Sequence, residues 1–281
     1  MKRAHGVGLL VFTTLIWGTT FPSIKVATAY LTPGQIVASR FAVALLALGW
    51  FLRKATRLTW WHGLLTGFLA AISFLSLALG MKTTGSARSG FLIGLNVILV
   101  PLAMPFLGRK LTPGAMLGAL LAAAGMAALA WDASVLTFSP GDWWVILSAA
   151  SFAAYILVMD RCVALHDSRA FTAAQISCVL VIALLFSAQQ GDHWPALHGP
   201  WPWVILYLGL VATAFAIWLQ VKGQQVVTPV QAAIIYSLEP VFAAAFSALL
   251  LHERLRAQDL LGGTLIVSGM IVCMLPQRNQ G

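Results

Sequence analysis

The sequence has 281 residues, of which 60% are hydrophobic and only 9% are charged, and its mean hydropathy is +0.88. Soluble globular chains carry about 25% charged residues, so this composition excludes a water-soluble protein. The formal charge of +9 is also compatible with nucleic-acid binding. However, the basic residues lie mostly in short gaps between apolar runs, where they orient a membrane protein. We therefore expect a lipid bilayer, and no nucleic acid, among the partners.

Ten apolar runs approach the length of about 20 residues with which a helix crosses a bilayer. In chain order these predicted spans cover about 6–26, 34–52, 61–80, 86–107, 113–131, 142–160, 170–188, 202–221, 228–251 and 257–275. The breaks between them carry turn residues, as in Thr32-Pro33-Gly34 and Ser139-Pro140-Gly141. No break is long enough for a folded domain, and no Gly-rich nucleotide-binding loop occurs. This argues against ATP-driven transport by the chain alone.

The distribution of Lys and Arg predicts the orientation of the spans. Eleven basic residues fall in the segments on the N-terminal side of the membrane, and three fall in the segments on the other side. Because Lys and Arg gather in cytoplasmic loops, both termini are predicted to face the cytoplasm. The cysteines Cys162, Cys178 and Cys273 show no metal-binding spacing, so no metal, cofactor or structural disulfide is expected.

An internal repeat divides the chain into residues 1–137 and 138–281. Aligning the fifth and tenth spans at an offset of 144 residues pairs Gly118 with Gly262, Gly125 with Gly269, and Met126 with Met270. A slip of one residue continues the match and sets Leu95-Asn96 against Leu238-Glu239. Chance similarity between membrane spans is the alternative. Since each half holds five spans, the second half enters the membrane from the opposite side, as in transporters built from inverted repeats.

The residues resemble the drug/metabolite transporter (DMT) superfamily, specifically its EamA-type, ten-span bacterial branch. The motifs that carry the resemblance are Trp17-Gly18-Thr19-Thr20-Phe21, Arg40-Phe41, Leu238-Glu239-Pro240-Val241, His252-Glu253-Arg254-Leu255 and the Gly262…Gly269 helix. The resemblance implies an all-α integral membrane protein of the bacterial inner membrane that moves small metabolites, commonly as an exporter of amino acids or related compounds. The first half has Gly108-Arg109-Lys110-Leu111 where the second has the Glu253 motif, so a role of Glu253 has no symmetric acidic counterpart.

Ionisable residues inside a bilayer are costly and are candidates for function. Glu239 lies midway along the ninth span, and the following Pro240 removes a backbone hydrogen bond there. Its carboxylate either binds a substrate amine or carries a proton, or it forms a strut with Arg40 or Arg88. Arg88 is a candidate for a substrate carboxylate, with outward snorkelling or structural pairing as the alternative. Arg40 is expected to pair structurally.

Polar and aromatic residues within the spans complete the candidate site. Asn96 either binds substrate or bonds between helices, and Thr20 either donates to substrate or bonds back to its own helix. The aromatic candidates for cavity walls, with core packing as the alternative, are Trp17, Tyr155, Trp218 and Tyr236.

The function predicted from these observations is transport of a small-molecule substrate by alternating access. An intramembrane enzyme is the less favoured class, because no HExxH, GxSxG or paired-aspartate motif lies in any span. A receptor or scaffold is a third class, which binds without moving solute. The sequence leaves open the substrate, export against import, proton coupling, and whether the protein is a monomer or a homodimer.

Overall fold

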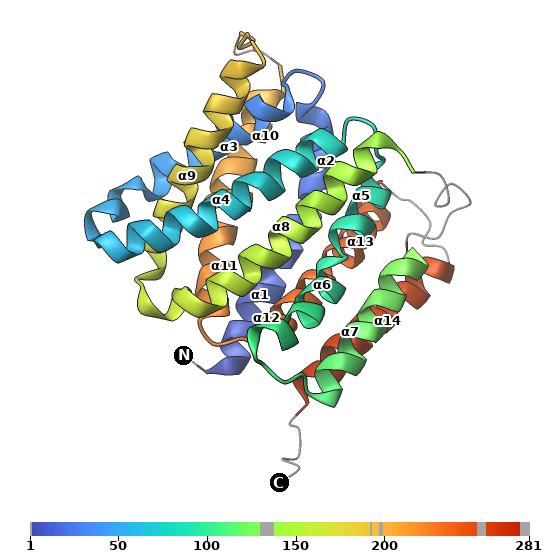
Figure 1. The fold of residues 1–281 in the computed structure, drawn as a ribbon. Coiled ribbons are helices and arrows are strands. Elements are labelled where there is room, and N and C mark those ends of the chain that lie inside the picture. The colour runs from blue at the N-terminus through green and yellow to red at the C-terminus, as the bar shows by residue number, and fades with distance from the viewer. Residues whose placement is uncertain (1, 130–137, 192, 197–198, 252–256, 276–281) are drawn as a thin grey trace.

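The computed structural model describes residues 2–129, 138–191, 193–196, 199–251 and 257–275 (Figure 1). Within these residues the chain is helical and contains no strand. The helices are α1 (Arg3–Gly18), α2 (Thr20–Ala27), α3 (Pro33–Leu48), α4 (Arg57–Gly80), α5 (Ser86–Ile93), α6 (Asn96–Ala103), α7 (Pro113–Leu129), α8 (Pro140–Cys162), α9 (Ser168–Gln189), α10 (Trp201–Gly209), the π-helical turn η5 (Leu210–Phe215), α11 (Ala216–Gln224), α12 (Pro229–Tyr236), α13 (Glu239–Leu251) and α14 (Ala257–Met274).

Combined into continuous rods, these elements correspond to the ten predicted spans. Eight rods are long and apolar enough to cross a membrane, and the two shorter apolar rods are Arg88–Ala103 and Pro113–Leu129. Large apolar side chains cover the outside of the molecule; Leu46 is 88% exposed and Phe106 is 91% exposed. Apolar surface on this scale is stable only in contact with lipid. The protein is therefore a multi-pass membrane protein.

Local sequence chemistry explains where several rods begin. Thr32 and Thr228 each precede a proline and accept a hydrogen bond from a glutamine backbone N–H three residues later. The side chains of Gln35 and Gln231 bond back to the backbone of these threonines. Such a capping box satisfies amide groups that a helix otherwise leaves without partners. The same device opens the second rod of the first half and the fourth rod of the second half.

Three rods are interrupted near their middle. α1 gives way to α2 at Thr19, α5 to α6 at Gly94–Leu95, and α12 to α13 at Ser237–Leu238. The last break lies just before Pro240, whose ring disfavours a regular helix through the preceding turn. A broken helix inside a membrane leaves backbone groups to be satisfied by protein or by a cavity. The three breaks therefore mark the region in which a polar site can form.

The two halves pack as pseudo-symmetric equivalents. α1 crosses α11 where a methyl group built on Gly223 would lie 3.0 Å from the Gly6 carbonyl oxygen. α8 crosses α4 in the same way, because a methyl group built on Gly80 would lie 2.8 Å from the Gly141 carbonyl oxygen. Gly141 follows Gly6 by 135 residues and Gly223 follows Gly80 by 143 residues. The contact between α1 and α11 is therefore repeated by the equivalent helices α8 and α4, with the first and second halves interchanged.

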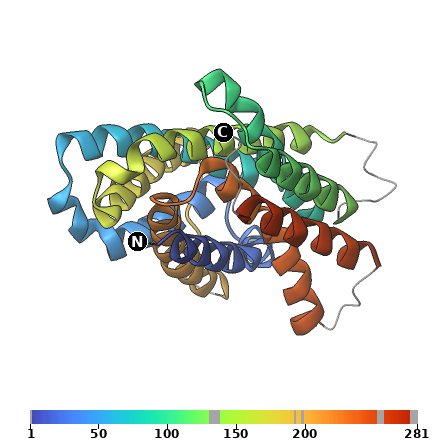
Figure 2. The same ribbon diagram turned by 90° about the horizontal axis from the view of Figure 1, so that it is seen from below.

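The pair formed by α7 and α14 shows the direction of this symmetry. The two helices lie side by side at one edge of the molecule (Figures 1 and 2), with Gly118 against Gly269 and Gly125 against Gly262. In the repeat alignment Gly118 corresponds to Gly262, and Gly125 to Gly269. The contact of Gly118 with Gly269 is thus repeated by their equivalents, Gly262 and Gly125, and such reciprocal contacts define a two-fold axis. The residue numbers run in opposite directions along the two helices. The halves are consequently inverted relative to each other, as the odd number of spans predicts.

Both chain ends lie at the same end of the molecule. The Arg3 guanidinium lies 4.0 Å from the Met274 sulfur, so the first helix begins where the last one finishes. We call this the N-terminal end. The predicted role of Glu253 concerns a residue outside the described part of the chain.

Candidate functional site

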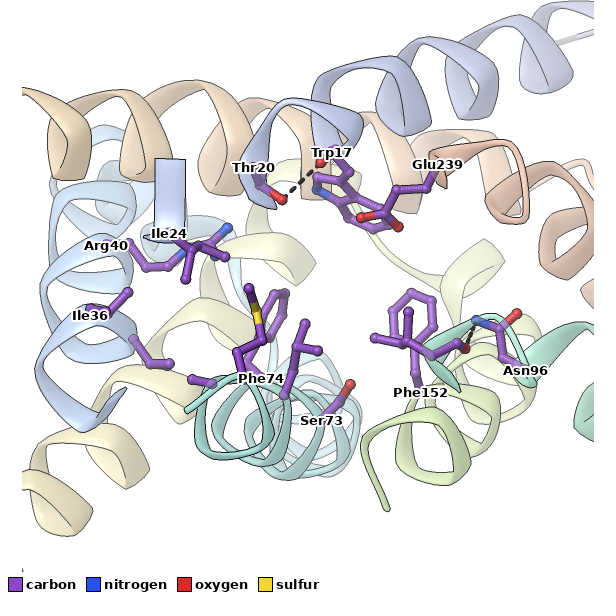
Figure 3. A pocket seen from close by; sticks show the side chains of 15 residues that line it. Trp17, Thr20, Ile24, Ile36, Arg40, Ser73, Phe74, Asn96, Phe152 and Glu239 are labelled. Carbon is purple, nitrogen blue, oxygen red and sulfur yellow. Dashed lines mark hydrogen bonds between the residues drawn. The ribbon is translucent and has the colours of Figure 1, made fainter. Parts of the chain in front are cut away.

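A cavity lies between the two halves, beside the breaks in three rods (Figure 3). Its lining residues Ile24, Ile36 and Met81 lie at the rod ends opposite the N-terminal end, and its volume is about 60 Å³. Its lining residues are Trp17, Thr20, Ile24, Ile36, Val37, Arg40, Ser73, Phe74, Leu77, Ala78, Met81, Ile93, Asn96, Phe152 and Glu239. Five of the candidates named from the sequence are among them. A mostly apolar wall with a few polar groups is typical of small-molecule sites.

Arg40 stands on α3 at one side of the cavity and is 3% exposed. Its Nε donates to Thr213 Oγ1 at 2.8 Å and its terminal nitrogen to the Ala212 carbonyl at 3.4 Å. The guanidinium carbon also lies 5.2 Å from the centre of the Phe74 ring. These contacts hold the planar guanidinium in one position, so the protein fixes the direction in which its remaining N–H groups point. The structural pairing expected for Arg40 is thus with polar groups of η5.

The π-helical turn η5 creates the acceptors that Arg40 uses. A π-turn inserts one extra residue into a helix and removes carbonyls from the regular ladder, a feature frequent at functional sites. Ala212 O accepts both from Arg40 and from the Trp17 indole N–H, the latter at 3.1 Å. Thr213 in turn donates to the Leu208 carbonyl at 2.7 Å. One inserted residue therefore positions two cavity side chains from two other helices.

Glu239 begins α13 on the opposite side of the cavity from Arg40 (Figure 3). The residue is half-buried and, like Trp17, lines the cavity. The ion pairs within the described residues join Arg88 to Asp142 and Arg109 to Asp160, so neither contains Glu239. No ion pair at contact distance joins Glu239 to Arg40 or Arg88 within the described residues, but Arg40 and Glu239 are close enough to interact electrostatically, so the strut with Arg40 stays a prediction.

Thr20 and Asn96 contribute further polar groups to the cavity wall. The Thr20 hydroxyl donates to the Trp17 carbonyl at 2.8 Å, which is the back-bonding alternative. The Asn96 Nδ2 donates to the Ile93 carbonyl at 3.0 Å, while its buried Oδ1 has no partner among the described residues. Asn96 therefore keeps one acceptor for a further hydrogen bond. Because a buried acceptor without a partner costs about 1–3 kcal/mol, this amide is a stronger candidate than the sequence alone indicates.

The other candidates lie outside this cavity. Arg88 pairs with Asp142, its terminal nitrogen 2.8 Å from the carboxylate, which is its structural alternative. Trp218 donates to Ser168 Oγ at 3.1 Å near the N-terminal end of the molecule. Tyr155 and Tyr236 lie beneath the cavity in the core. Pro240 lies in the first turn of α13 and shapes the break before Glu239.

Several residues that line the cavity or hold a predicted candidate in place have no signal in the sequence. Phe152 packs against Trp17 with ring centroids 6.0 Å apart and forms the floor of the cavity with it. Phe74 carries the cation–π contact of Arg40. Asp142 is fully buried and accepts from Arg88 and from Thr84. Aromatic residues are common in every span, so only the fold distinguishes these from lipid-facing ones.

The described residues contain no group of three or more His, Cys, Asp or Glu side chains arranged to hold a metal ion. The side chains that line the cavity supply one guanidinium, one carboxylate, one amide, the hydroxyls of Thr20 and Ser73, and aromatic faces. These groups bind solutes by charge, hydrogen bonding and stacking.

The sequence model of the EamA-like transporter family matches residues 4–131 and again 139–275. An "uncharacterized transporter" of Archaeoglobus fulgidus is 25% identical over 98% of this chain and 87% of its own length. The "uncharacterized transporter YwfM" of Bacillus subtilis is 29% identical over 96% of this chain and 94% of its own length. The "uncharacterized inner membrane transporter YicL" of Salmonella typhimurium is 30% identical over 49% of this chain and 46% of its own length.

A solved crystal structure has a similar fold. It aligns with a TM-score of 0.78 over 97% of each chain, at 20% sequence identity. At this identity the likeness concerns the arrangement of helices.

Proposed function

This chain belongs to the EamA-like transporter family, and we propose that it exports small polar metabolites, such as amino acids or related compounds, by alternating access. The observation that carries the proposal is the placement of opposite charges across one cavity, with Arg40 from the first repeat and Glu239 from the second. An arginine fork suits a solute carboxylate, and a carboxylate suits a solute ammonium group. The two groups together favour a zwitterion.

The apolar walls complement this pair of charges. Phe74, Phe152 and Leu77 surround the space between the polar groups. Such walls accept an apolar side chain of the solute and strengthen charge interactions by excluding water. The cavity's volume of about 60 Å³ is below the roughly 300–1,000 Å³ of ligand pockets. A metabolite therefore enters only when the two halves move apart, which is the motion that alternating access requires.

Charge distribution supports placing the N-terminal end of the molecule in the cytoplasm. Arg169 lies 5.0 Å from the Phe51 ring centre and 5.6 Å from that of Trp218, and Lys222 lies 5.0 Å from the same indole. Basic residues and tryptophans meet in this way at membrane interfaces, with the positive charges on the cytoplasmic side. The cavity then lies nearer to the outer face of the membrane than to the cytoplasm.

Transport in liposomes tests the proposal. Vesicles containing the purified protein are loaded with radiolabelled amino acids, nucleosides or a cationic dye, with and without a pH gradient. We expect flux of at least one zwitterionic amino acid. Absence of flux for every compound would contradict transport, and flux of only nucleosides or dye would contradict the zwitterion. Flux that a pH gradient does not change would exclude proton coupling.

Two variants connect that flux to the cavity. Glu239→Gln removes a charge that faces the solute, so we expect at least about a tenfold loss of flux, equivalent to 1.4 kcal/mol. Asn96→Ala removes one hydrogen bond and is expected to lose about two- to tenfold. Intact flux in both variants would remove these residues from the site.

A further inference from the structure

A cluster of buried polar residues lies between the cavity and the N-terminal end of the molecule. The Tyr155 hydroxyl lies 2.9 Å from Gln175 Oε1 and 3.3 Å from Gln220 Oε1. Gln224 lies one helical turn beyond Gln220 on the same face of α11. All four side chains are at most 3% exposed. The cluster is separated from the cavity by Trp17 and Phe152, with Tyr236 packed against both.

The inverted repeat relates this cluster to the cavity. With the 135-residue offset fixed by the glycine crossings, Trp17 corresponds to Phe152, Thr20 to Tyr155, and Arg40 to Gln175. With the 143-residue offset, Leu77 corresponds to Gln220 and Met81 to Gln224. The first member of each pair lines the cavity. Its equivalents therefore line the position at which the same cavity would open toward the N-terminal end.

Packing at one further crossing fixes the relation between Arg40 and Gln175 independently. A methyl group built on Gly67 would lie 2.8 Å from the Gln175 carbonyl oxygen. A methyl group built on Gly209 would lie 2.9 Å from the Arg40 carbonyl oxygen. Gly209 follows Gly67 by 142 residues rather than 143, and the difference is the one residue that the π-turn η5 inserts after Gly209.

Packing alone does not account for glutamines in this cluster. The equivalent positions on the cavity side hold Leu77 and Met81, so the fold accepts apolar side chains at this crossing. Both amide atoms of Gln224 have no hydrogen-bond partner among the described residues, and the Gln220 amide lies beside the hydroxyl groups of Tyr155 and Tyr236. A buried polar group without a partner costs about 1–3 kcal/mol. Amides kept at such a cost are explained by a second conformation in which they have partners.

We propose that Tyr155, Gln175, Gln220 and Gln224 form a second solute-binding site, which opens to the cytoplasm when the two halves exchange conformations. The proposal rests on alternating access as proposed above and adds the residues and chemistry of the inner side. This inner site offers a phenol and three carboxamides, which both donate and accept hydrogen bonds. It holds Gln175 where the cavity holds Arg40, so it binds the polar groups of the solute without a fixed cation. Phe152 and Trp17 separate the two sites in the conformation described here.

Cysteine accessibility tests the inner site without knowledge of the solute. In a background where Cys162, Cys178 and Cys273 are replaced by alanine, single cysteines are introduced as Gln220→Cys, Gln224→Cys, Leu77→Cys and Met81→Cys. Each protein is labelled with a membrane-impermeant maleimide in vesicles of either orientation. Leu219→Cys, buried to a similar degree on another face of α11, is the matched control.

The expected labelling is reciprocal. Gln220→Cys and Gln224→Cys react from the cytoplasmic side at least about tenfold faster than Leu219→Cys, while Leu77→Cys and Met81→Cys react from the outside. Labelling of the glutamine positions no faster than the control, from either side, would overturn the inner site. If that occurred while the wild-type protein moved solute, the proposed function would stand and the inner site alone would fail.

Conversion of the inner residues into their cavity equivalents provides a second measurement. Gln220→Leu and Gln224→Met are expected to lower the flux of the transported amino acid about three- to tenfold for each hydrogen bond lost. Both variants should elute from a sizing column like the wild type, because Leu77 and Met81 occupy the same crossing in the other half. Undiminished flux in both would overturn the role of the amides.

Discussion

The two halves of this protein share one pattern of helix crossings but differ in the side chains around their common centre. Glycines lie at equivalent crossings in both halves, at Gly80 and Gly223 and again at Gly67 and Gly209. Near these crossings the pseudo-two-fold symmetry makes Gln175 the equivalent of Arg40, and Glu239 the equivalent of Asn96. Close packing leaves little freedom at a crossing, whereas a side chain that contacts solute can differ between the halves. The fold is thus symmetric, and the chemistry of the site is not.

Substitution of a glycine at one of the shared helix crossings should have the largest effect on folding. Gly125→Val places a branched side chain where a single methyl group already lies 2.5 Å from the Gly262 carbonyl oxygen and 2.9 Å from the Ile266 nitrogen. Backbone atoms cannot move aside as a side chain can, so we expect loss of most folded protein. Size-exclusion profiles and thermal unfolding in detergent measure the effect.

A glycine outside the crossings gives the matched control. A methyl group built on Gly8 meets no atom within 4 Å. Gly8→Ala should leave the unfolding temperature unchanged or raise it, because alanine favours a helix by about 1 kcal/mol over glycine. Equal behaviour of the two variants would show that the crossings do not limit packing.

Arg40 provides the sharpest test of the chemical difference between the halves. Arg40→Gln gives the cavity the side chain that the inner cluster has at the equivalent position, and the amide can still bond to Thr213. We expect folded protein with at least about tenfold lower flux of a zwitterionic amino acid, since the fixed charge is lost. Arg40→Lys keeps a charge without the planar fork and should retain more flux. Equal flux in the wild type and Arg40→Gln would show that the solute does not use this cation.

Two ion pairs at opposite ends of the molecule offer a comparison of intermediate size. Asp142 is fully buried and accepts from Arg88, Thr84 and the Ser139 backbone nitrogen. Removing one member of a buried pair costs about 3 kcal/mol or more, so Asp142→Ala should clearly lower the unfolding temperature. Asp160 pairs with Arg109, whose side chain is 43% exposed, and exposed pairs contribute about 0–1 kcal/mol. If Asp160→Ala destabilised the protein as much as Asp142→Ala, burial would not be the deciding factor.

Sequence patterns predicted those features of the protein that depend on neighbouring residues. Hydropathy located the rods, and Pro240 located the break before Glu239. The matched glycines of the fifth and tenth spans predicted the inverted repeat. These signals are local, because apolar length and proline geometry act within a few turns of the chain.

Features that depend on residues far apart in the chain could not be predicted from the sequence. Arg88 and Asp142 are separated by 54 positions, and no local pattern links them. The π-turn η5 depends on Thr213 and Ala212 receiving Arg40 and Trp17 from other helices. Gln175, Gln220 and Gln224 look like ordinary polar residues within spans until the fold brings them together. One signal for η5 was available in the sequence. The offset between Gly67 and Gly209 is one residue shorter than that between Gly80 and Gly223, which indicates an inserted residue between Gly209 and Gly223.

The smallest expected effect concerns a histidine pair at the N-terminal end. His166 lies between α8 and α9, with its Nε2 2.8 Å from His62 Nδ1 and its Nδ1 3.2 Å from Thr59 Oγ1. Burial, and to a smaller extent the charge of His62, lowers the pKa of His166 below its usual value. The unfolded chain therefore binds a proton more readily than the folded protein. Stability is fully present above the unfolded pKa of about 6.5 and falls as the pH drops through the lower folded pKa.

This linkage predicts how one substitution changes the pH profile of unfolding. His166→Gln keeps a polar side chain beside Thr59 but cannot take up a proton. Between pH 7.5 and 5 we expect the unfolding temperature of the wild type to fall further than that of His166→Gln, by about 2 °C or more. His193→Gln, a change at the other end of the molecule, should leave the wild-type profile intact. Parallel profiles for the wild type and His166→Gln would show that the histidine pair does not contribute to the loss of stability at low pH. The difference in stability between the two ends of the molecule would then depend on the ion pairs alone.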